Sequence, residues 1–579
     1  MKDLIVSFIM AGGALAACAD SRVREIVRPV RVVWSTNATE TARLLGERYG
    51  QVPEGRWANG SPAVLSAAGD APSAVLLDFG RELHGGLQIA SGAGSSNGDA
   101  QVRVRFGESV AEAMSELGER GACNDHAIRD SVIDLPWFGT REIGNTGFRF
   151  VRIDRVRGTV ALESVRAVSL MRPMERLGSF RCSDERLNAI FETAVRTVHL
   201  CCQDYLWDGI KRDRLVWMGD THPELQVILA VFGAAPVVSA SLDFAAATTP
   251  ADSAWMNTMP NYSLWWVRNL HDWYRQTGDR AYLARHHDYL KKLLPRVLVH
   301  IKEDGSQDFG GFLDWPTHHS SAAENAGTAG LLAMTLEEAA FLARELDDGD
   351  MASACEKGLA RLRLRQPSAE GSKQAAALLA LSGLRDPKEM FAETIGKGGV
   401  AGVSTFYGYY MLEAMSAAGE NACALRTIRD YWGAMLDMGA TSFWEDFNVA
   451  WTNNAFRIDE LPVAGRRDIH GDYGEFCYKG FRHSLCHGWS AGPAAWLIRH
   501  VLGIRALDVG CHTVEVRPFL GDLVWAEGAL ATPAGAVHVK VRRDASGKTV
   551  ATVSAPDGVQ IVSPETSVEI EGEGKRSRP

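Results

Sequence analysis

The sequence lacks the features of several common protein classes. None of its ten cysteines forms a C-x-x-C pair, so the sequence indicates neither a structural zinc site nor a disulfide framework. The 61 basic and 71 acidic side chains are interspersed and give a net charge of −10, which argues against a nucleic-acid partner. No repeat of about 34 or 40 residues recurs, which argues against a solenoid. The glycine-rich run from Gly92 to Gly98 is not followed by a helical pattern, which favours a hairpin connection over a dinucleotide-binding loop.

The N-terminus has the layout of an export signal. Lys2 precedes an apolar run from Leu4 to Ala17, which is too short to span a membrane. The run closes with Leu15-Ala16-Ala17-Cys18, which resembles the lipobox of bacterial lipoproteins, where Cys18 carries the lipid. We therefore expect residues 1–18 to direct export to the periplasm or the outer membrane, with the lipid as the only membrane contact. The alternative is a buried N-terminal helix.

Three patterns divide the rest of the chain. In residues 19–175, short alternating runs such as Val102–Phe106 are broken by turn residues and predict an antiparallel β-sandwich. In residues 176–505, apolar side chains recur with a period near 3.6 and predict about a dozen helices. An (α/α)6 barrel of six helical hairpins is the natural closed arrangement for them. Alternation returns in residues 506–579, which are predicted to form a small C-terminal β domain with a polar tail.

The densest group of charged residues lies between Asp208 and Asp220. Its functional candidates are three carboxylates, an arginine and a tryptophan, namely Asp208, Arg212, Asp213, Trp217 and Asp220. Thr221 and Glu224 have the spacing of a capping box, so we expect a helix to begin there and the motif to be a loop. Carboxylates held by neighbouring guanidinium groups can ionise at different pH values, as an acid and base pair requires. A solvated charged turn is the alternative.

Three further loops carry candidate residues. Glu445 follows Trp444, and an acid beside an indole is partly desolvated, which raises its pKa toward a value useful for proton transfer. Asp314 and Trp315 could supply a hydroxyl-binding carboxylate and a ring that stacks on a sugar. His487 precedes the last helix of the region and is a candidate partner for a sugar hydroxyl. The alternatives are an aromatic-packed loop for the first pair and a helix-start histidine for His487.

These motifs resemble, in order along the chain, those of the bacterial α-L-rhamnosidases of glycoside hydrolase family 78. The segment Asp208–Asp220 is similar to the family signature Asp-x-x-x-Arg-[Glu/Asp]-Arg-Leu-x-Trp-x-Gly-Asp. Ala440–Glu445 resembles the family's Ala-Thr-Thr-x-Trp-Glu stretch, and Ser484–Trp496 resembles its Ser-x-x-His segment. Arg517–Gly528 resembles its motif Arg-Pro-x-Leu-Gly-Asp-Leu-x-Trp-Ala-x-Gly. The resemblance extends over most of the chain after the signal.

The resemblance implies a multidomain glycoside hydrolase whose (α/α)6 barrel is flanked by an N-terminal and a C-terminal β-sandwich. It implies removal of terminal α-L-rhamnose with inversion, with Asp213 as the general acid and Glu445 as the base that activates water. The substrate-binding residues that it implies are Asp208, Arg212, Trp217, Asp220, Asp314, Trp315, Trp444 and His487. The expected partner is a rhamnose-containing carbohydrate. We expect no cofactor or metal, calcium is not indicated, and the oligomeric state is left open.

The chain also departs from the family pattern. Asp213 stands where Glu is usual, so its carboxyl is one methylene shorter and must approach the substrate more closely. Gly209-Ile210-Lys211 replaces the usual Cys-Pro segment. The stretch between Glu445 and His487 is long, and we expect it to alter the pocket through five polar or aromatic residues, namely Asp468, His470, Asp472, Tyr473 and Glu475.

Two other functions are left open. A polysaccharide lyase on the same barrel would abstract a proton next to a uronate carboxylate, with a tyrosine, histidine or lysine as base and a cation or an arginine to neutralise that carboxylate. Candidate tyrosines for that role are Tyr407, Tyr409, Tyr410, Tyr473 and Tyr478. A non-catalytic glycan-binding lipoprotein is the third reading of the same sequence.

Overall fold

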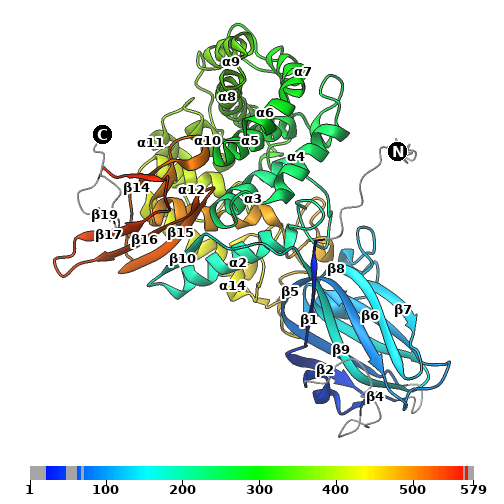
Figure 1. Cartoon of the computed structure of the whole chain (residues 1–579). Coiled ribbons are helices and arrows are strands. Elements are labelled where there is room, and N and C mark those ends of the chain that lie inside the picture. Colours follow the sequence, from blue (N-terminus) through cyan, green and yellow to red (C-terminus); the bar gives the residue numbers. More distant parts are fainter. Residues whose placement is uncertain (1–20, 47–61, 67–70, 565–567, 571–579) are drawn as a thin grey trace.

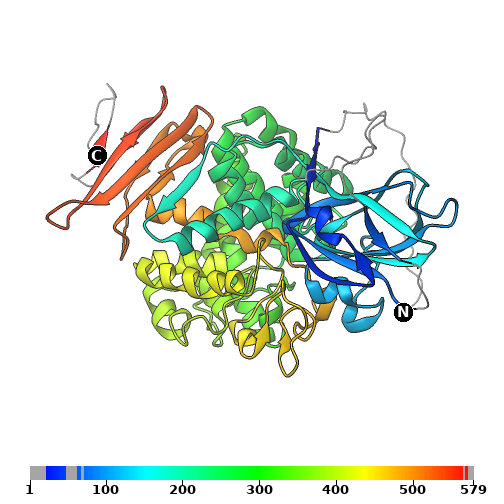
Figure 2. The ribbon, with the colours of Figure 1, turned by 90° about the horizontal axis from the view of Figure 1, so that it is seen from below.

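The computed structural model describes residues 21–46, 62–66, 71–564 and 568–570. The predicted signal and its Cys18 lie outside these residues. The described chain forms an N-terminal β region, a helical region and a C-terminal β region (Figure 1). Two views at right angles show the β regions on opposite sides of the helices (Figures 1 and 2).

The N-terminal β region is a hydrogen-bonded sheet of nine strands with the order β3-β4-β9-β5-β8-β6-β7, to which β1 and β2 add by pairing with β9 and β5. The strands are β1 (Val23–Val27), β2 (Arg31–Thr36), β3 (Ala38–Thr39), β4 (Ala63–Leu65), β5 (Ala74–Ser91), β6 (Gln101–Gly107), β7 (Asp130–Asp134), β8 (Gly139–Arg157) and β9 (Val160–Met171). All pairs are antiparallel. The long strand β5 pairs with β2 along its first part and with β9 along its second.

The alternation of apolar residues in these strands places one set of side chains inside. Val75 and Leu77 of β5 pack with Val102 and Val104 of β6 in the buried core of this region. The prediction of a hairpin at Gly92–Gly98 is wrong, because this segment joins β5 to β6, which lie on either side of β8. As expected, no helix follows the glycine run directly.

The helical region contains most of the buried aromatic residues. Its α-helices are α2 (Glu185–Cys201), α3 (Met218–Val231), α4 (Pro236–Thr248), α5 (Pro260–Thr277), α6 (Arg280–Arg285), α7 (His287–Leu298), α8 (Ser321–Glu345), α9 (Gly349–Leu362), α10 (Lys373–Leu381), α11 (Pro387–Met390), α12 (Gly408–Ala417), α13 (Asn421–Thr427), α14 (Gly433–Asp437) and α15 (Pro493–Trp496). Every residue of α3 is buried, so this helix is covered on all sides by its neighbours, which include α5 and α15.

The expected capping box at Thr221 is wrong. Helix α3 begins three residues earlier, at Met218, and Trp217 is its N-cap. The Thr221 hydroxyl donates to the Trp217 carbonyl at 3.0 Å within the first turn. The Glu224 carboxyl is buried without a hydrogen bond to any described residue, and burial raises its pKa well above the ordinary value. Asp220 therefore lies in the first turn of a helix, not in a loop.

The C-terminal β region has a five-stranded sheet of order β10-β15-β16-β17-β19 and a three-stranded sheet of order β13-β14-β18. The strands are β10 (Ser179–Cys182), β13 (Ile504–Ala506), β14 (Thr513–Val516), β15 (Trp525–Thr532), β16 (Gly535–Arg543), β17 (Thr549–Ser554), β18 (Gln560–Val562) and β19 (Val568–Ile570). Strand β10 lies inside the range 176–505 that the sequence assigns to the helical domain, yet it pairs with β15. The chain thus crosses to the C-terminal sheet before it enters α2 (Figure 1).

Polar contacts join the N-terminal sheet to the helical region. The Arg149 guanidinium donates to the Asp78 carboxylate at 2.9 and 3.1 Å and to the Gly439 carbonyl at 3.0 Å. The Glu82 backbone N–H donates to the Thr441 hydroxyl at 2.9 Å. Gly439 and Thr441 lie just before Glu445 in the chain, so the N-terminal sheet supports the segment that carries a candidate catalytic residue.

The nine described cysteines are all free, and the adjacent pair Cys201 and Cys202 is buried, as expected for small apolar side chains. Among the described helices, none is both long and apolar enough to cross a membrane.

Candidate active site

A cavity of about 190 Å³ lies beside the N-terminal ends of α3 and α5. It brings together residues from five separate parts of the chain. Its lining consists of Asp208, Arg212, Asp213, Trp217, Asp220, Met259, Tyr262, Phe312, Trp315, Glu445, Cys477, Tyr478, His487 and Trp489. All of the predicted site residues are among them except Asp314 and Trp444.

Asp208 organises the loop that carries Asp213. Its buried carboxylate accepts the backbone N–H groups of Asp213 at 2.8 Å and Leu215 at 3.0 Å. Its own backbone N–H donates to the Leu215 carbonyl at 3.0 Å, which closes the loop. Gly209 fits this tight turn because a Cβ there would lie 2.5 Å from the Arg212 carbonyl oxygen. Burial raises the pKa of Asp208 to about 7.

Arg212 joins the two predicted catalytic carboxyl groups. Its Nη1 lies 3.3 Å from both carboxylate oxygens of Glu445, while its Nε and Nη2 lie 3.1 and 2.9 Å from Oδ1 of Asp213. One planar guanidinium therefore holds both groups in fixed orientations.

The surroundings of the two carboxyl groups differ. Glu445 is 2% exposed and accepts the Ser484 backbone N–H at 2.9 Å. Burial raises the pKa of Glu445, and the positive charge of Arg212 acts in the opposite direction. The Asp213 side chain is 18% exposed and is therefore the more accessible of the two. A buried carboxylate beside a cation and a more accessible carboxyl can take the roles of base and acid in one reaction.

Asp220 and His487 form a hydrogen-bonded pair in the lining of the cavity. Nε2 of His487 lies 3.0 Å from Oδ1 of Asp220, and the Tyr262 hydroxyl donates to Oδ2 at 3.1 Å. Burial raises the pKa of Asp220 to about 8. His487 precedes a short 3-10 helix but its side chain does not cap it, so its ring is directed to the cavity and not to the helix start.

Aromatic rings form the walls. The Trp315 indole N–H donates to the Tyr478 hydroxyl at 2.6 Å, and the Trp217 ring meets Tyr262 edge to face with centroids 5.7 Å apart. Five lining residues were not predicted from the sequence, namely Met259, Tyr262, Phe312, Cys477 and Trp489, and Tyr478 was a candidate only as the base of a lyase. The one usable signal was positional: Tyr262 lies in the first turn of a helix, as Asp220 does.

Asp314 and Trp444 support the cavity from behind. The Asp314 carboxylate accepts the Trp315 backbone N–H at 2.9 Å and a hydrogen bond from the Ser404 hydroxyl. Burial raises its pKa to about 7. Trp444 is fully buried and packs edge to face against Phe447. Neither lines the cavity, so the structure places these two predicted substrate-binding residues outside it.

The long stretch between Glu445 and His487 does reach the cavity, but not through the five residues expected. Asp468 pairs with Arg120 at 3.1 Å and Tyr473 stacks on Trp451, both away from the cavity lining. Cys477 and Tyr478 line it instead. Figure 2 shows the helical region between the two β regions.

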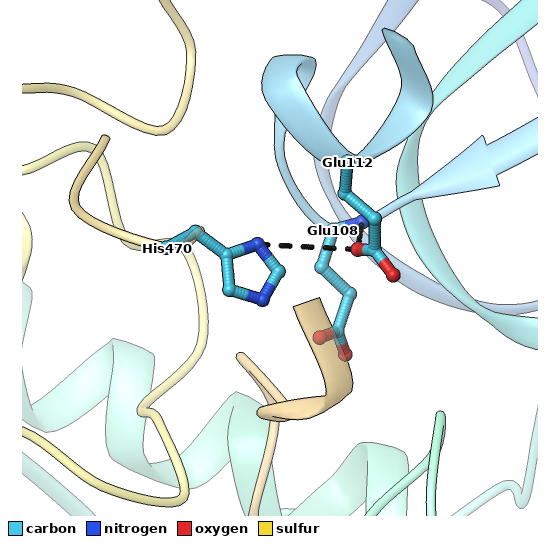
Figure 3. A group of neighbouring side chains, drawn as sticks. All are labelled: Glu108, Glu112 and His470. Atoms are coloured by element: carbon cyan, nitrogen blue, oxygen red, sulfur yellow. Dashed lines mark hydrogen bonds and ion pairs between the residues drawn. The ribbon is translucent and has the colours of Figure 1, made fainter. Parts of the chain in front are cut away.

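A buried ionic cluster lies just outside the cavity. Glu108, Glu112 and His470 have donor atoms close enough to hold a metal ion (Figure 3). The ammonium group of Lys211 already lies 3.0 Å from Glu108 and 3.2 Å from Glu112. Nδ1 of His470 lies 2.8 Å from the Ser109 hydroxyl, so its ring also has a protein partner. Lys211 therefore supplies the positive charge that these carboxylates need.

Comparisons with known proteins concern part of the helical region and the fold. Residues 175–362 match the family model for the bacterial alpha-L-rhamnosidase 6 hairpin glycosidase domain, which covers the loop from Asp208 to Asp220. No curated protein matches the chain.

Solved structures of rhamnosidases share the fold. The family GH78 rhamnosidase of Bacillus sp. GL1 superposes with a TM-score of 0.70 at 23% identity, over 93% of this chain and 56% of that chain. The rhamnosidase from Klebsiella oxytoca with rhamnose bound gives 0.67 at 20% identity, over 83% and 96%. The α-L-rhamnosidase from Aspergillus terreus gives 0.66 at 19%, over 86% and 60%. This chain thus spans little more than half the length of the Bacillus and Aspergillus proteins, and its multidomain fold is that of the GH78 rhamnosidases.

Replacing Lys211 should destabilise the protein. In Lys211→Met, two buried carboxylates lose their cation, and removing one partner of a buried ion pair costs about 3–5 kcal/mol. We expect urea denaturation to show a loss of this size. Lys302→Met, which breaks an exposed pair with Asp308, is the matched control and should leave stability almost unchanged. Equal stability of Lys211→Met and the parent protein would contradict this account of the cluster.

Four buried carboxyl groups should lower the stability of the protein as the pH rises from about 4 to about 8, whereas His84 and His222, whose pKa burial lowers to about 3 and about 4, act in the opposite direction up to about pH 6.5. Burial raises the pKa of Asp208, Asp314 and Asp446 to about 7 and that of Asp220 to about 8, whereas these groups titrate near 3.9 in an unfolded chain. Within this window each of these four groups binds more protons in the folded state than in the unfolded state, so each lowers the free energy of unfolding as the pH rises.

Asp446→Asn isolates one of these contributions. Asparagine does not titrate, so denaturation curves at pH 5 and pH 8 should differ less for this variant than for the parent protein. An identical pH dependence in the two proteins would show that Asp446 is not protonated in the folded state.

Proposed function

We propose that this chain, which is GH78 α-L-rhamnosidase-like in its family match and fold, is a glycoside hydrolase that removes terminal α-L-rhamnose from glycosides or oligosaccharides. The observation that carries the proposal is the contact of one guanidinium, that of Arg212, with both Asp213 and Glu445 in a single cavity. The rhamnose bound to the Klebsiella oxytoca rhamnosidase supports a rhamnose-containing substrate.

Two carboxyl groups divide the chemistry. Asp213 donates its proton to the glycosidic oxygen as the bond to the anomeric carbon breaks. Glu445 accepts a proton from the water that attacks that carbon from the opposite face, and the anomeric configuration inverts. Inverting glycosidases separate the two carboxyl groups by about 6.5–9.5 Å, which leaves room for the water. Arg212 favours the ionised form of Glu445 that this role requires.

The remaining lining matches the chemistry of a deoxy sugar. Asp220, His487 and Asp208 present hydrogen-bonding groups on one side, which can bind hydroxyls. Trp217, Trp315 and other rings present apolar surface, which suits the C–H groups and the methyl group of rhamnose. A cavity of about 190 Å³ suits a single sugar residue, so the proposed bond is the one to a terminal sugar.

The proposal includes the domain plan and the location. Residues 19–175 and 506–579 form the flanking β-sandwich domains, and residues 176–505 form the (α/α)6 barrel that holds the site. The multidomain rhamnosidase fold and the six-hairpin family match support this plan. Export to the periplasm or outer membrane, with a lipid on Cys18, rests on the sequence of residues 1–18 alone.

Removal of either carboxyl group should abolish turnover. Asp213→Asn and Glu445→Gln keep the side-chain volume but cannot act as acid or base, so kcat on p-nitrophenyl α-L-rhamnoside should fall by about two orders of magnitude or more. The denaturation midpoints should change little. Asp204→Asn, an exposed position near the same loop, is the matched control and should keep full activity. Full activity in Asp213→Asn would refute the assignment of the acid.

The anomer released first should be β-L-rhamnose. Attack by water on the face opposite the leaving group inverts the α configuration, and proton NMR recorded during the first minutes of hydrolysis distinguishes the two anomers. Release of α-L-rhamnose first would contradict the assignment of Glu445 as a base. A product that absorbs in the ultraviolet as an unsaturated sugar would favour the lyase reading instead.

A further inference from the structure

We propose that an exposed aromatic pair, Trp137 and Phe138, is a second carbohydrate-binding site, which holds the polysaccharide whose terminal rhamnose the cavity removes. The pair lies at the tip of the hairpin that joins β7 to β8 in the N-terminal β region. The identity of the bound polysaccharide rests on the function proposed above. The binding itself does not, because it needs neither Asp213 nor Glu445.

Both rings are open to solvent. Trp137 is 50% exposed and Phe138 is 37% exposed. Large aromatic side chains contribute much of the apolar area that a protein buries, so two adjacent rings at a loop tip leave apolar surface in contact with water. Turns usually carry glycine, proline, asparagine, aspartate or serine instead. Exposed loops on a rigid scaffold are also where binding residues concentrate.

The hairpin backbone is unfavourable for one of the two rings. Phe138 has a φ of 55°, in the left-handed region that glycine adopts most readily. A phenylalanine here raises the energy of the folded state, and residues in such conformations cluster at binding and active sites. The fold alone gives no reason to keep an aromatic ring at this position, whereas ligand binding does.

The two rings form an inclined surface that suits a sugar. Their centroids are 5.8 Å apart, and their planes meet at 37°. The indole N–H of Trp137 donates to the Ala93 carbonyl at 3.3 Å, which fixes the ring and leaves its apolar atoms as the free surface. The face of an aromatic ring is partly negative and attracts the C–H groups on one side of a pyranose.

Polar groups for sugar hydroxyls lie at the end of the same hairpin. Asp134 is the last residue of β7, and its Oδ1 accepts a hydrogen bond from Nε2 of Gln101 at 3.0 Å. Asp134 is itself exposed. Aromatic rings next to an exposed amide and carboxylate are the combination that a sugar, with apolar C–H faces and polar hydroxyls, requires.

Two other occupants fit the tip less well. A stable protein interface buries about 1,000 Å² or more, far beyond what two partly exposed rings offer. An anionic membrane attracts clusters of basic residues, but from Asp134 to Glu142 the hairpin carries two carboxylates and a single basic residue, Arg141. The chemistry of the tip therefore favours a sugar over a second copy of the chain or a lipid surface.

The distance of the tip from the cavity indicates a polymer. Gly139 begins β8 at the tip, and Gly147 of the same strand packs on Ile210 and Lys211. These eight residues of strand extend up to roughly 27 Å, so one short glycoside cannot contact both sites. A polysaccharide can, and its binding at the tip raises the concentration of its chain ends near the cavity.

Affinity electrophoresis tests the site directly. The probe is gum arabic, a soluble branched polysaccharide that ends in α-L-rhamnose, held in a native gel. The protein is the full chain with Glu445→Gln, which does not consume the probe. We expect gum arabic to retard this protein and Trp137→Ala, in the same background, to weaken the apparent affinity about tenfold. Phe244→Ala, which removes a ring that is 39% exposed in α4, is the matched control and should be retarded like its parent.

Phe138→Gly separates binding from folding. Glycine adopts a φ of 55° without strain, so the urea midpoint of this variant should equal or exceed that of the parent while its retardation weakens. A lower midpoint with unchanged retardation would show that the ring only packs the hairpin and would overturn the proposal.

Hydrolysis assays with Glu445 intact distinguish this site from the catalytic one. Trp137→Ala should cleave p-nitrophenyl α-L-rhamnoside at the parent rate but release rhamnose from gum arabic several times more slowly. Equal retardation of Trp137→Ala and its parent would refute the second site and leave the proposed function standing. Loss of sedimentation with phosphatidylglycerol vesicles in Trp137→Ala, with retardation unchanged, would assign the pair to a membrane and refute it too. If the parent cleaves no rhamnoside but Trp137→Ala still weakens retardation, the proposed function fails and the second site stands.

Discussion

Several carboxyl groups are buried in and beside the cavity, and two adjacent cations, Lys211 and Arg212, compensate part of their negative charge. Lys211 and Arg212 are neighbours in the chain but extend in opposite directions. Lys211 reaches Glu108 and Glu112 of the N-terminal β region, and Arg212 reaches Asp213 and Glu445 in the cavity. Buried carboxylates without such partners would be protonated or would unfold the site. The contacts of Lys211 with the N-terminal β region and those of Arg212 with the cavity residues together fix the position of the loop at residues 208–217.

The N-terminal β region is therefore part of the site and not only an appendage. Its Glu108 accepts the Leu485 backbone N–H at 2.6 Å, close to the segment that donates to Glu445. Its residue Gly147 packs so tightly on the loop at residues 208–217 that a Cβ there would lie 2.9 Å from the backbone nitrogen of Lys211. These contacts give a reason for the Gly-Ile-Lys sequence at residues 209–211, because the Lys211 side chain pairs with Glu108 and Glu112 of the N-terminal β region.

The sequence predicts best those site residues that lie together in one short segment of the chain. The spacing of Asp208, Asp213 and Asp220 identified one side of the cavity, since a single loop and the helix after it carry all three. Glu445 and His487 lie far away in the chain and were identified through their motifs. Tyr262 has only a weak signal, its place in the first turn of a helix, because its role depends on Asp220, which the fold brings opposite it.

The errors have equally physical reasons. Thr221 and Glu224 have the spacing of a capping box, but burial of the whole helix removes the solvent-exposed end that such a box serves. Strand β10 is four residues long and too short for its alternation to stand out before a helix. Asp314 looked like a sugar ligand because it precedes Trp315, whereas its carboxylate is used by backbone and hydroxyl donors behind that ring.

The central claim is that Asp213 and Glu445 act on opposite faces of one rhamnose residue. A crystal structure of the Glu445→Gln protein with an intact α-L-rhamnoside tests it most directly. The account predicts the anomeric carbon between the two side chains, with Oδ2 of Asp213 within hydrogen-bond distance of the glycosidic oxygen. A rhamnoside bound outside this cavity, or with both side chains on the same face of the sugar, would contradict it.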